Sequence, residues 1–127
     1  MATSTPTNTP TSTRTPTPTP LPSNLRIVHV EYAGLDNEYV LIENQGPGDQ
    51  AMTGWTLSDE NNNTYFFLAG FTLHRGQDIH VWTKSGTSTN IDLYWGRDNG
   101  VWGKDDTAYL RDNTGTMIDS FSWSSTE

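Results

Sequence analysis

Residues 38–59 read EYVLIENQGPGDQAMTGWTLSD, and this stretch decides the fold class. Its first part, Glu38–Asn44, is rich in β-branched and apolar residues, which is typical of a central strand. The segment Gln45–Gln50 contains glycine and proline, which interrupt regular structure. Beyond it, Thr53–Ser58 alternates polar and apolar residues in the manner of a half-buried strand. The stretch therefore predicts a strand, a tight turn and a second strand.

Short strands separated by turn residues continue through the rest of the chain. We expect five more strands, each bounded by polar or glycine-containing segments, at Leu25–Ala33, Thr64–Leu68, Gln77–Lys84, Asp106–Asp112 and Thr116–Trp123. No stretch of ten residues repeats its apolar residues with the 3.6-residue period of a helix. Short strands at this regular spacing predict an all-β sandwich or barrel with no helix.

Alternation within these strands also predicts which side chains face the core. In the first strand it puts Val28, Val30 and Tyr32 on one face. In Gln77–Lys84 it puts the aliphatic residues inside and Trp82 outside.

The first 24 residues differ in composition from the remainder. They hold nine threonines and six prolines, and Leu21 is their one sizeable aliphatic residue after the initial methionine. Proline fixes φ and removes a backbone donor, so Thr-Pro repeats favour polyproline II and cannot build a core. We therefore expect a disordered Thr/Pro-rich linker over residues 1–24 and one folded domain over 25–127. Linkers of this composition are typical of extracellular spacers.

The charge balance limits the classes of partner. The chain has 15 acidic and seven basic residues, a net charge of −8, and its lysines and arginines are scattered. Phosphate binding needs clustered bases, so nucleic acid and membrane surfaces are not expected as partners. A cationic partner, a metal ion or a neutral glycan is compatible with this charge. An acidic surface also favours a soluble monomer.

Residues suited to catalysis form no recognisable motif. The chain has no cysteine, which excludes disulfides, thiolate zinc sites and cysteine nucleophiles. Its histidines, His29, His74 and His80, lack metal-ligand spacing, and no G-x-S-x-G elbow is present. A small sandwich also offers little concave room for a substrate. We therefore expect no enzyme activity and no cofactor. A small metal-dependent hydrolase acting through loop carboxylates is the less favoured alternative.

One acidic loop contains the oxygen ligands that calcium prefers. Asp98, Asn99, Asp105 and Asp106 would converge if this loop folds back on itself. The same residue types are common in ordinary turns, and the spacing of an EF-hand loop is absent. Two interpretations stay open, a calcium site and a plain turn, of which the plain turn is favoured.

Aromatic residues near polar segments suggest a second kind of site. Tyr94 and Trp95 are the expected surface rings, and Trp82 is a further candidate. Exposed rings stack on sugars, so these three residues would serve a carbohydrate-binding module. Packing in the core or under a loop is the competing interpretation.

Several motifs occur in an order that resembles a known family. They are Tyr39–Asn44 with the glycine-rich turn after it, Met52–Asp59, Tyr65–Phe67, Leu73 with Gly76, Trp102, Thr107–Asp112, Gly115 and Ile118–Asp119. This order resembles the lamin tail domain over about residues 25–123. The resemblance implies an immunoglobulin-like β-sandwich of seven to nine strands.

The resemblance also implies a function. Nuclear lamins carry this domain behind a coiled-coil rod and a basic localisation signal, whereas this chain has a Thr/Pro segment and neither of those features. It is therefore more similar to the bacterial exported branch of the family. That branch implies a non-catalytic accessory module, at the cell surface or outside the cell, that docks to an unknown protein or to a cell-surface glycan.

The matching residues have structural rather than catalytic interpretations. Trp55 is expected to fill the core between the sheets. Gly54 would permit a close backbone approach or a bulge. Gly76 and Gly115 would provide turn conformations. Asn44 would hydrogen-bond the backbone where its strand ends.

Overall fold

The folded part of the chain consists of β-strands joined by turns and loops. A computed structural model describes residues 21–124, which contain ten strands and no helix. The strands are β1 (Leu25–Glu31), β2 (Tyr39–Asn44), β3 (Gln50–Ala51), β4 (Thr56–Ser58), β5 (Thr64–Phe66), β6 (Thr72–Leu73), β7 (Asp78–Trp82), β8 (Asp92–Tyr94), β9 (Asp106–Arg111) and β10 (Met117–Trp123). Most of the predicted linker, residues 1–20, lies outside the described residues. Within the described part, no helix is present that could cross a bilayer.

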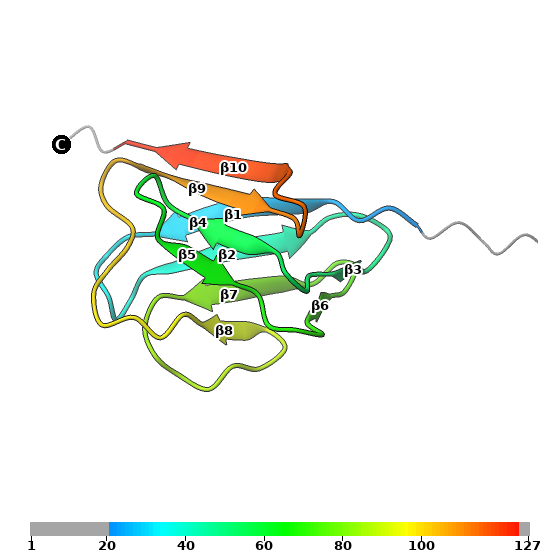
Figure 1. The fold of residues 1–127 in the computed structure, drawn as a ribbon, viewed down its shortest axis with the longest axis horizontal. Helices are drawn as coiled ribbons and strands as arrows, with labels where there is room; N and C mark the ends of the chain where they lie inside the picture. Colours follow the sequence, from blue (N-terminus) through cyan, green and yellow to red (C-terminus); the bar gives the residue numbers. More distant parts are fainter. Residues whose placement is uncertain (1–20, 125–127) are drawn as a thin grey trace, which may run out of the picture.

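Two four-stranded sheets pack face to face. Their strand orders are β1-β2-β7-β8 and β10-β9-β4-β5, and β3 pairs with β6 in a separate ribbon. In Figure 1, β4, β5 and β9 lie in front of the sheet that contains β2 and β7. All pairs are antiparallel except β7 with β8, which is parallel. The predicted all-β, immunoglobulin-like sandwich without helices is confirmed.

The core lies between the two sheets and follows from the alternation of the strands. The fully buried aliphatic side chains of the first sheet are Val40, Ile42, Ile79, Val81 and Leu93, and those of the second include Leu57, Ala108 and Leu110. Burying an aliphatic side chain of this size contributes about 1.5–3 kcal/mol, so this set is the main source of stability. Trp55 closes one end of the core from the loop before β4, with 6% of its surface exposed.

A β-bulge in β1 overturns one prediction. The pairing of β1 with β2 shifts register between Ile27 and His29. The extra residue turns the strand over, so that Ile27 and Val30 are both buried while Val28 is only partly covered. Tyr32 is exposed. The prediction that Val28, Val30 and Tyr32 share one face is therefore wrong, because simple alternation does not survive an inserted residue.

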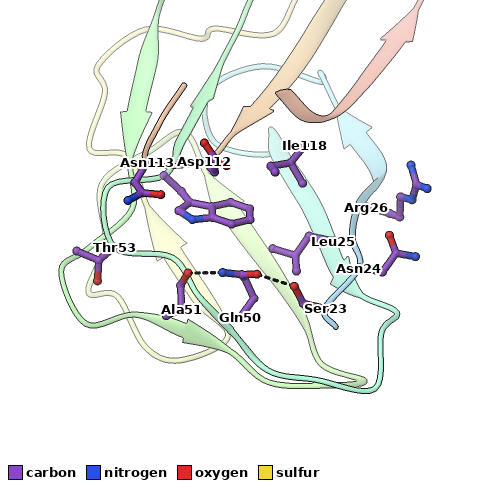
Figure 2. Close-up of a pocket in the computed structure, with 11 residues that line it drawn as sticks. Ser23, Asn24, Leu25, Arg26, Gln50, Ala51, Thr53, Asp112, Asn113 and Ile118 are labelled. Carbon is purple, nitrogen blue, oxygen red and sulfur yellow. Dashed lines mark hydrogen bonds between the residues drawn. The ribbon is translucent and has the colours of Figure 1, made fainter. Parts of the chain in front are cut away.

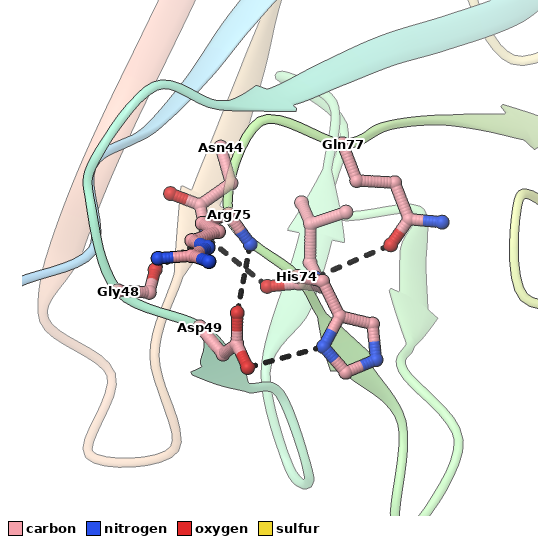
Figure 3. A network of polar contacts seen from close by, with 7 residues as sticks. Asn44, Gly48, Asp49, His74, Arg75 and Gln77 are labelled. Carbon is pink, nitrogen blue, oxygen red and sulfur yellow. Dashed lines mark hydrogen bonds and ion pairs between the residues drawn. The ribbon is translucent and has the colours of Figure 1, made fainter.

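Asn44 organises the turn that follows β2 (Figure 3). Its side-chain amide donates to the carbonyls of Gly48 at 2.8 Å and Leu73 at 3.0 Å, and its Oδ1 accepts the backbone N–H of Gly46 at 3.1 Å. The side chain is fully buried, so these bonds also satisfy its own polar atoms. The Asn44 side chain thus joins the end of β2 to the end of β6.

The residues just before β1 are attached to the same turn. The carbonyl of Pro22 accepts the N–H of Gly48 at 3.1 Å, and the carbonyl of Asn24 accepts the N–H of Gln45 at 2.8 Å. A Cβ on Gly48 would lie 2.0 Å from the carbonyl oxygen of Leu21, so only glycine fits at that position. Composition assigned these residues to the linker, yet the chain is held against the domain from Pro22 onward.

Candidate functional site

The outer face of the β1-β2-β7-β8 sheet carries a continuous row of rings, here called the aromatic stripe. Its members are His29, Tyr39, His80, Trp82 and Tyr94. Tyr39 lies 5.9 Å from His29, 4.8 Å from His80 and 5.0 Å from Trp82 between ring centroids. Trp82 lies 5.6 Å from His80 and 6.5 Å from Tyr94. The stripe therefore crosses all four strands of the sheet.

The pairing register puts these rings side by side. Tyr39 is the direct partner of Trp82, and Trp82 is the direct partner of Tyr94. Their neighbours in sequence, among them Val40 and Val81, point into the core, so alternation turns the rings outward. Aromatic pairs at such distances contribute about 0.5–1.5 kcal/mol beyond area burial. The stripe is thus a preformed surface rather than a set of independent side chains.

Carboxylates flank the stripe on both sides. The indole Nε1 of Trp82 donates to Oδ1 of Asp92 at 3.0 Å, and the same oxygen lies 3.8 Å from Nδ1 of His80. At the other end, Nε2 of His29 lies 3.6 Å from a carboxylate oxygen of Glu31. These polar side chains are between a third and a half exposed. A ligand on the stripe would therefore meet rings and hydrogen-bonding groups together.

Two of the rings are partly covered by the loop after β7. A Cβ on Gly86 would lie 2.4 Å from the ring of Tyr94, so the Gly86 backbone packs directly on that ring. The ammonium of Lys84 lies 4.9 Å from the centre of the Trp82 ring, a cation–π distance. The loop therefore covers the β8 end of the stripe, whereas His29 at the β1 end is exposed.

Trp95 does not belong to this surface. The alternation of β8 turns Leu93 inward, Tyr94 outward and Trp95 inward again. The ring of Trp95 packs edge-on against Tyr65 at 5.9 Å and Trp102 at 6.2 Å. This placement corrects the expectation that Trp95 is a surface ring.

The acidic loop before β9 uses its carboxylate for its own backbone. Asp106 is buried and accepts the N–H groups of Thr107 at 2.8 Å, Glu60 at 3.3 Å and Gly103 at 3.3 Å. Asp98, Asn99 and Asp105 are exposed. Among the described residues, no three histidine or acidic side chains gather in a way that could hold a metal ion. The calcium site, the less favoured of the two interpretations, needs Asp98, Asn99, Asp105 and Asp106 to converge, and the acidic members of this set do not gather.

Among residues 21–124, Glu38 is the most deeply buried ionisable residue, and its role escaped the sequence interpretation. Only 1% of its surface is exposed. Its Oε1 accepts the backbone N–H groups of Val101 at 2.5 Å and Trp102 at 3.3 Å. Its Oε2 lies so close to Gly100 that a Cβ there would be 2.9 Å away. Glu38 therefore fixes the loop that carries Trp102 onto the start of β2.

The three family glycines sit in turns. Gly54, Gly76 and Gly115 have φ values of 81°, 70° and 85°, a region that side chains disfavour. Gly54 also lies close to Asn113, since a Cβ there would be 3.1 Å from the Asn113 Cβ.

A surface cluster links the Asn44 turn to the loop after β6 (Figure 3). Asp49 accepts the backbone N–H of Arg75 at 2.8 Å and lies 3.2 Å from Nδ1 of His74. The Arg75 N–H, followed by the His74 side chain, lowers the pKa of Asp49 below its ordinary value. The cluster is exposed and fastens two loops, so we regard it as structural.

Sequence comparison agrees with the fold. The family model described as Lamin Tail Domain matches residues 18–125, which is most of the chain. The resemblance stated from the motif order is thereby confirmed. The match begins before β1 and runs past β10, so it covers both sheets and the stripe. The chain belongs to the lamin tail domain family.

Proposed function

We propose that this chain is a non-catalytic docking module of an exported or cell-surface protein, and that the aromatic stripe is its contact surface. The family is an immunoglobulin-like interaction domain, which favours binding over catalysis. The observation that carries the proposal is the continuous row of partly exposed rings on the outer face of one sheet. Tyrosine and tryptophan are enriched where proteins bind partners, because one end of each ring is apolar and the other polar.

The buried polar residues support a structural rather than a catalytic role for the interior. Glu38, Asn44, Asp59 and Asp106 each accept backbone N–H groups of a turn or loop. A carboxylate whose oxygens already accept two or three such bonds is occupied by the fold and is not open to a substrate. The sites with free capacity for a ligand are at the surface.

The test is binding of the purified full chain to cell-envelope fragments. Trp82→Ala removes the centre of the stripe and should abolish cosedimentation with the fragments. Phe66→Ala is the matched control, because Phe66 is an exposed ring on the opposite sheet, with 67% of its surface open. Equal loss in both variants, or none in Trp82→Ala, would contradict the stripe as the contact surface.

Trp82→Ala also removes the bond to Asp92, so folding needs its own check. An amide spectrum that keeps the core resonances establishes that the variant is folded. His80→Ala offers a second, smaller truncation of the stripe and should weaken binding in the same direction.

The stripe also favours a second candidate, a carbohydrate-binding module. Rings flanked by carboxylates are the arrangement that holds a sugar by stacking and hydroxyl contacts. Retention on insoluble polysaccharide, lost in Trp82→Ala and kept in Phe66→Ala, would select this candidate. Binding to envelope protein but to no polysaccharide would select protein docking.

A further inference from the structure

A cavity of about 540 Å³ opens at the end of the sandwich where the chain enters β1 (Figure 2). It lies between the start of β1, the β3 segment and the β9–β10 hairpin. Leu25, Trp55 and Ile118 form its apolar wall, and Asn24, Gln50 and Asn113 are part of its polar rim. Its size falls within the range of pockets that hold small ligands or peptide segments. The cavity is separate from the aromatic stripe, which lies on a sheet face.

The wall and rim contain hydrogen-bonding groups that the described residues do not use. Within residues 21–124, the indole Nε1 of Trp55 makes no hydrogen bond, and it is not one of the buried polar atoms that lack a partner, so it is accessible at the cavity wall. The side-chain amides of Asn24 and Asn113 likewise make none within that part of the chain. An occupant with backbone or other carbonyl oxygens would satisfy these donors.

The charges at the cavity are already engaged. Arg26 pairs with Asp119 at 3.4 Å. Asp112 accepts the side chain of Thr114 at 2.7 Å and the N–H of Thr116 at 3.0 Å. The cavity therefore suits an uncharged occupant.

The chain itself contains such a segment. Residues 3–20 are threonines and prolines, apart from two serines, Asn8 and Arg14. Arg14 carries the only charge in this segment. Proline offers an apolar ring and strong carbonyl acceptors, and proline-rich segments dock on aromatic-lined grooves without loss of much conformational entropy. The segment ends at Pro20, and Ser23 already lines the cavity. Attachment so close to the cavity gives an effective concentration in the millimolar range.

We propose that the cavity binds a Thr-Pro stretch from residues 3–20 of the same molecule. Docking shortens the distance that the linker spans, and release lengthens it. The cavity would thus set how far residues 3–20 extend from the domain. This inference does not depend on the stripe.

Paramagnetic labelling tests the proposal in the full chain. The chain has no cysteine, so Asn8→Cys gives a single site for a nitroxide label. We expect broadening of the Trp55 indole and Asn113 amide signals, with the Phe66 amide unaffected. Ala51→Trp, which plugs the cavity from its exposed edge, should remove this broadening. Thr53→Trp is a second plug for use if the first variant does not fold.

Each other outcome counts against the proposal. Equal broadening with and without the plug would show that the label merely passes near the cavity. A mixture of spin-labelled chain without isotopes and isotope-enriched chain without the label reports only contacts between molecules. Broadening seen only in that mixture would show that the cavity binds the segment of a second molecule. Trp82→Ala should leave the broadening unchanged, so failure of the stripe and failure of the cavity are separate results.

Discussion

Glu38 holds Trp102 in place through a bond between its carboxylate and the backbone of the tryptophan. Oε1 of Glu38 accepts the Trp102 N–H at 3.3 Å and that of the preceding residue, Val101, at 2.5 Å. The ring of Trp102 then packs at 5.9 Å against Trp123 and at 6.2 Å against Trp95. One buried carboxylate thereby connects β2, the long loop before β9, and β10.

Glu38→Ala should lower the free energy of unfolding by about 3 kcal/mol, because bonds to a charged group contribute about 1.5–3 kcal/mol each and two N–H groups lose their partner. Chemical denaturation measures this loss. Glu43→Ala, a carboxylate in the following strand β2, is the control, and we expect a change within about 0.5 kcal/mol. Similar stabilities for the Glu38 variant and the wild type would refute the anchoring role.

Thr83→Val should raise the free energy of unfolding by about 1 kcal/mol. Among residues 21–124 the buried Thr83 hydroxyl has no hydrogen-bond partner, so the isosteric valine removes an uncompensated polar group. Thermal unfolding of the two proteins provides the comparison, with the exposed Thr87→Val as a control near zero. A lower melting temperature for Thr83→Val would mean that the hydroxyl is hydrogen-bonded in solution.

Tyr65 should be the last tyrosine to ionise. Burial raises its pKa to about 12, since the phenolate would lie in an apolar site. Between pH 10 and 12 the unfolded chain loses this proton while the folded chain keeps it. Stability should therefore fall with rising pH over that window, by at most about 1.4 kcal/mol per pH unit. Ultraviolet titration detects the late ionisation, and Tyr65→Phe should abolish that phase.

Thr114→Ala should raise the pKa of Asp112 toward its ordinary value. The Thr114 side chain is the main cause that holds this pKa low, followed among favourable contacts by backbone N–H groups of the same hairpin. Because the pKa of Asp112 is lower in the folded chain than in the unfolded chain, its ionised form stabilises the fold at pH values above the unfolded-state pKa. This contribution to stability is lost as the pH falls through the folded-state pKa. Carboxyl NMR titration follows the change. Asp49 is an internal reference, because its pKa depends on Arg75 and His74 and should not move.

Strands with undisturbed alternation were predictable from sequence. Residues such as Val40, Val81 and Leu110 lie where the period of two puts them, and the outward position of Trp82 followed from the same rule. β3 and β6 have two residues each and β8 has three, which is too short for a period to be visible. The bulge in β1 depends on an unpaired residue that no local pattern reveals.

The candidate site was predictable only in part. Trp82 and Tyr94 were recognised as outward rings, whereas their continuity through Tyr39 depends on strand pairing between distant segments. Alternation alone predicts that Tyr39 points to the outer face, because its neighbour Val40 points into the core. The strand order is also needed to show that Tyr39 lies beside Trp82. Trp95 was misplaced because a three-residue strand ends just before it and continues its alternation.

The first and last strands give the domain a mechanical axis. β1 begins at one end of the sandwich and β10 finishes at the other, and the two strands point the same way (Figure 1). A pull applied between Leu25 and Trp123 would run along both strands, so the bonds to β2 and β9 would be sheared together instead of opening one by one. The link from Asp119 to the Ile27 N–H at 2.8 Å, which joins these two strands, would share that tension. Single-molecule stretching should find a high rupture force that Asp119→Ala reduces, and unzipping at low force would show that the tension takes another route through the domain.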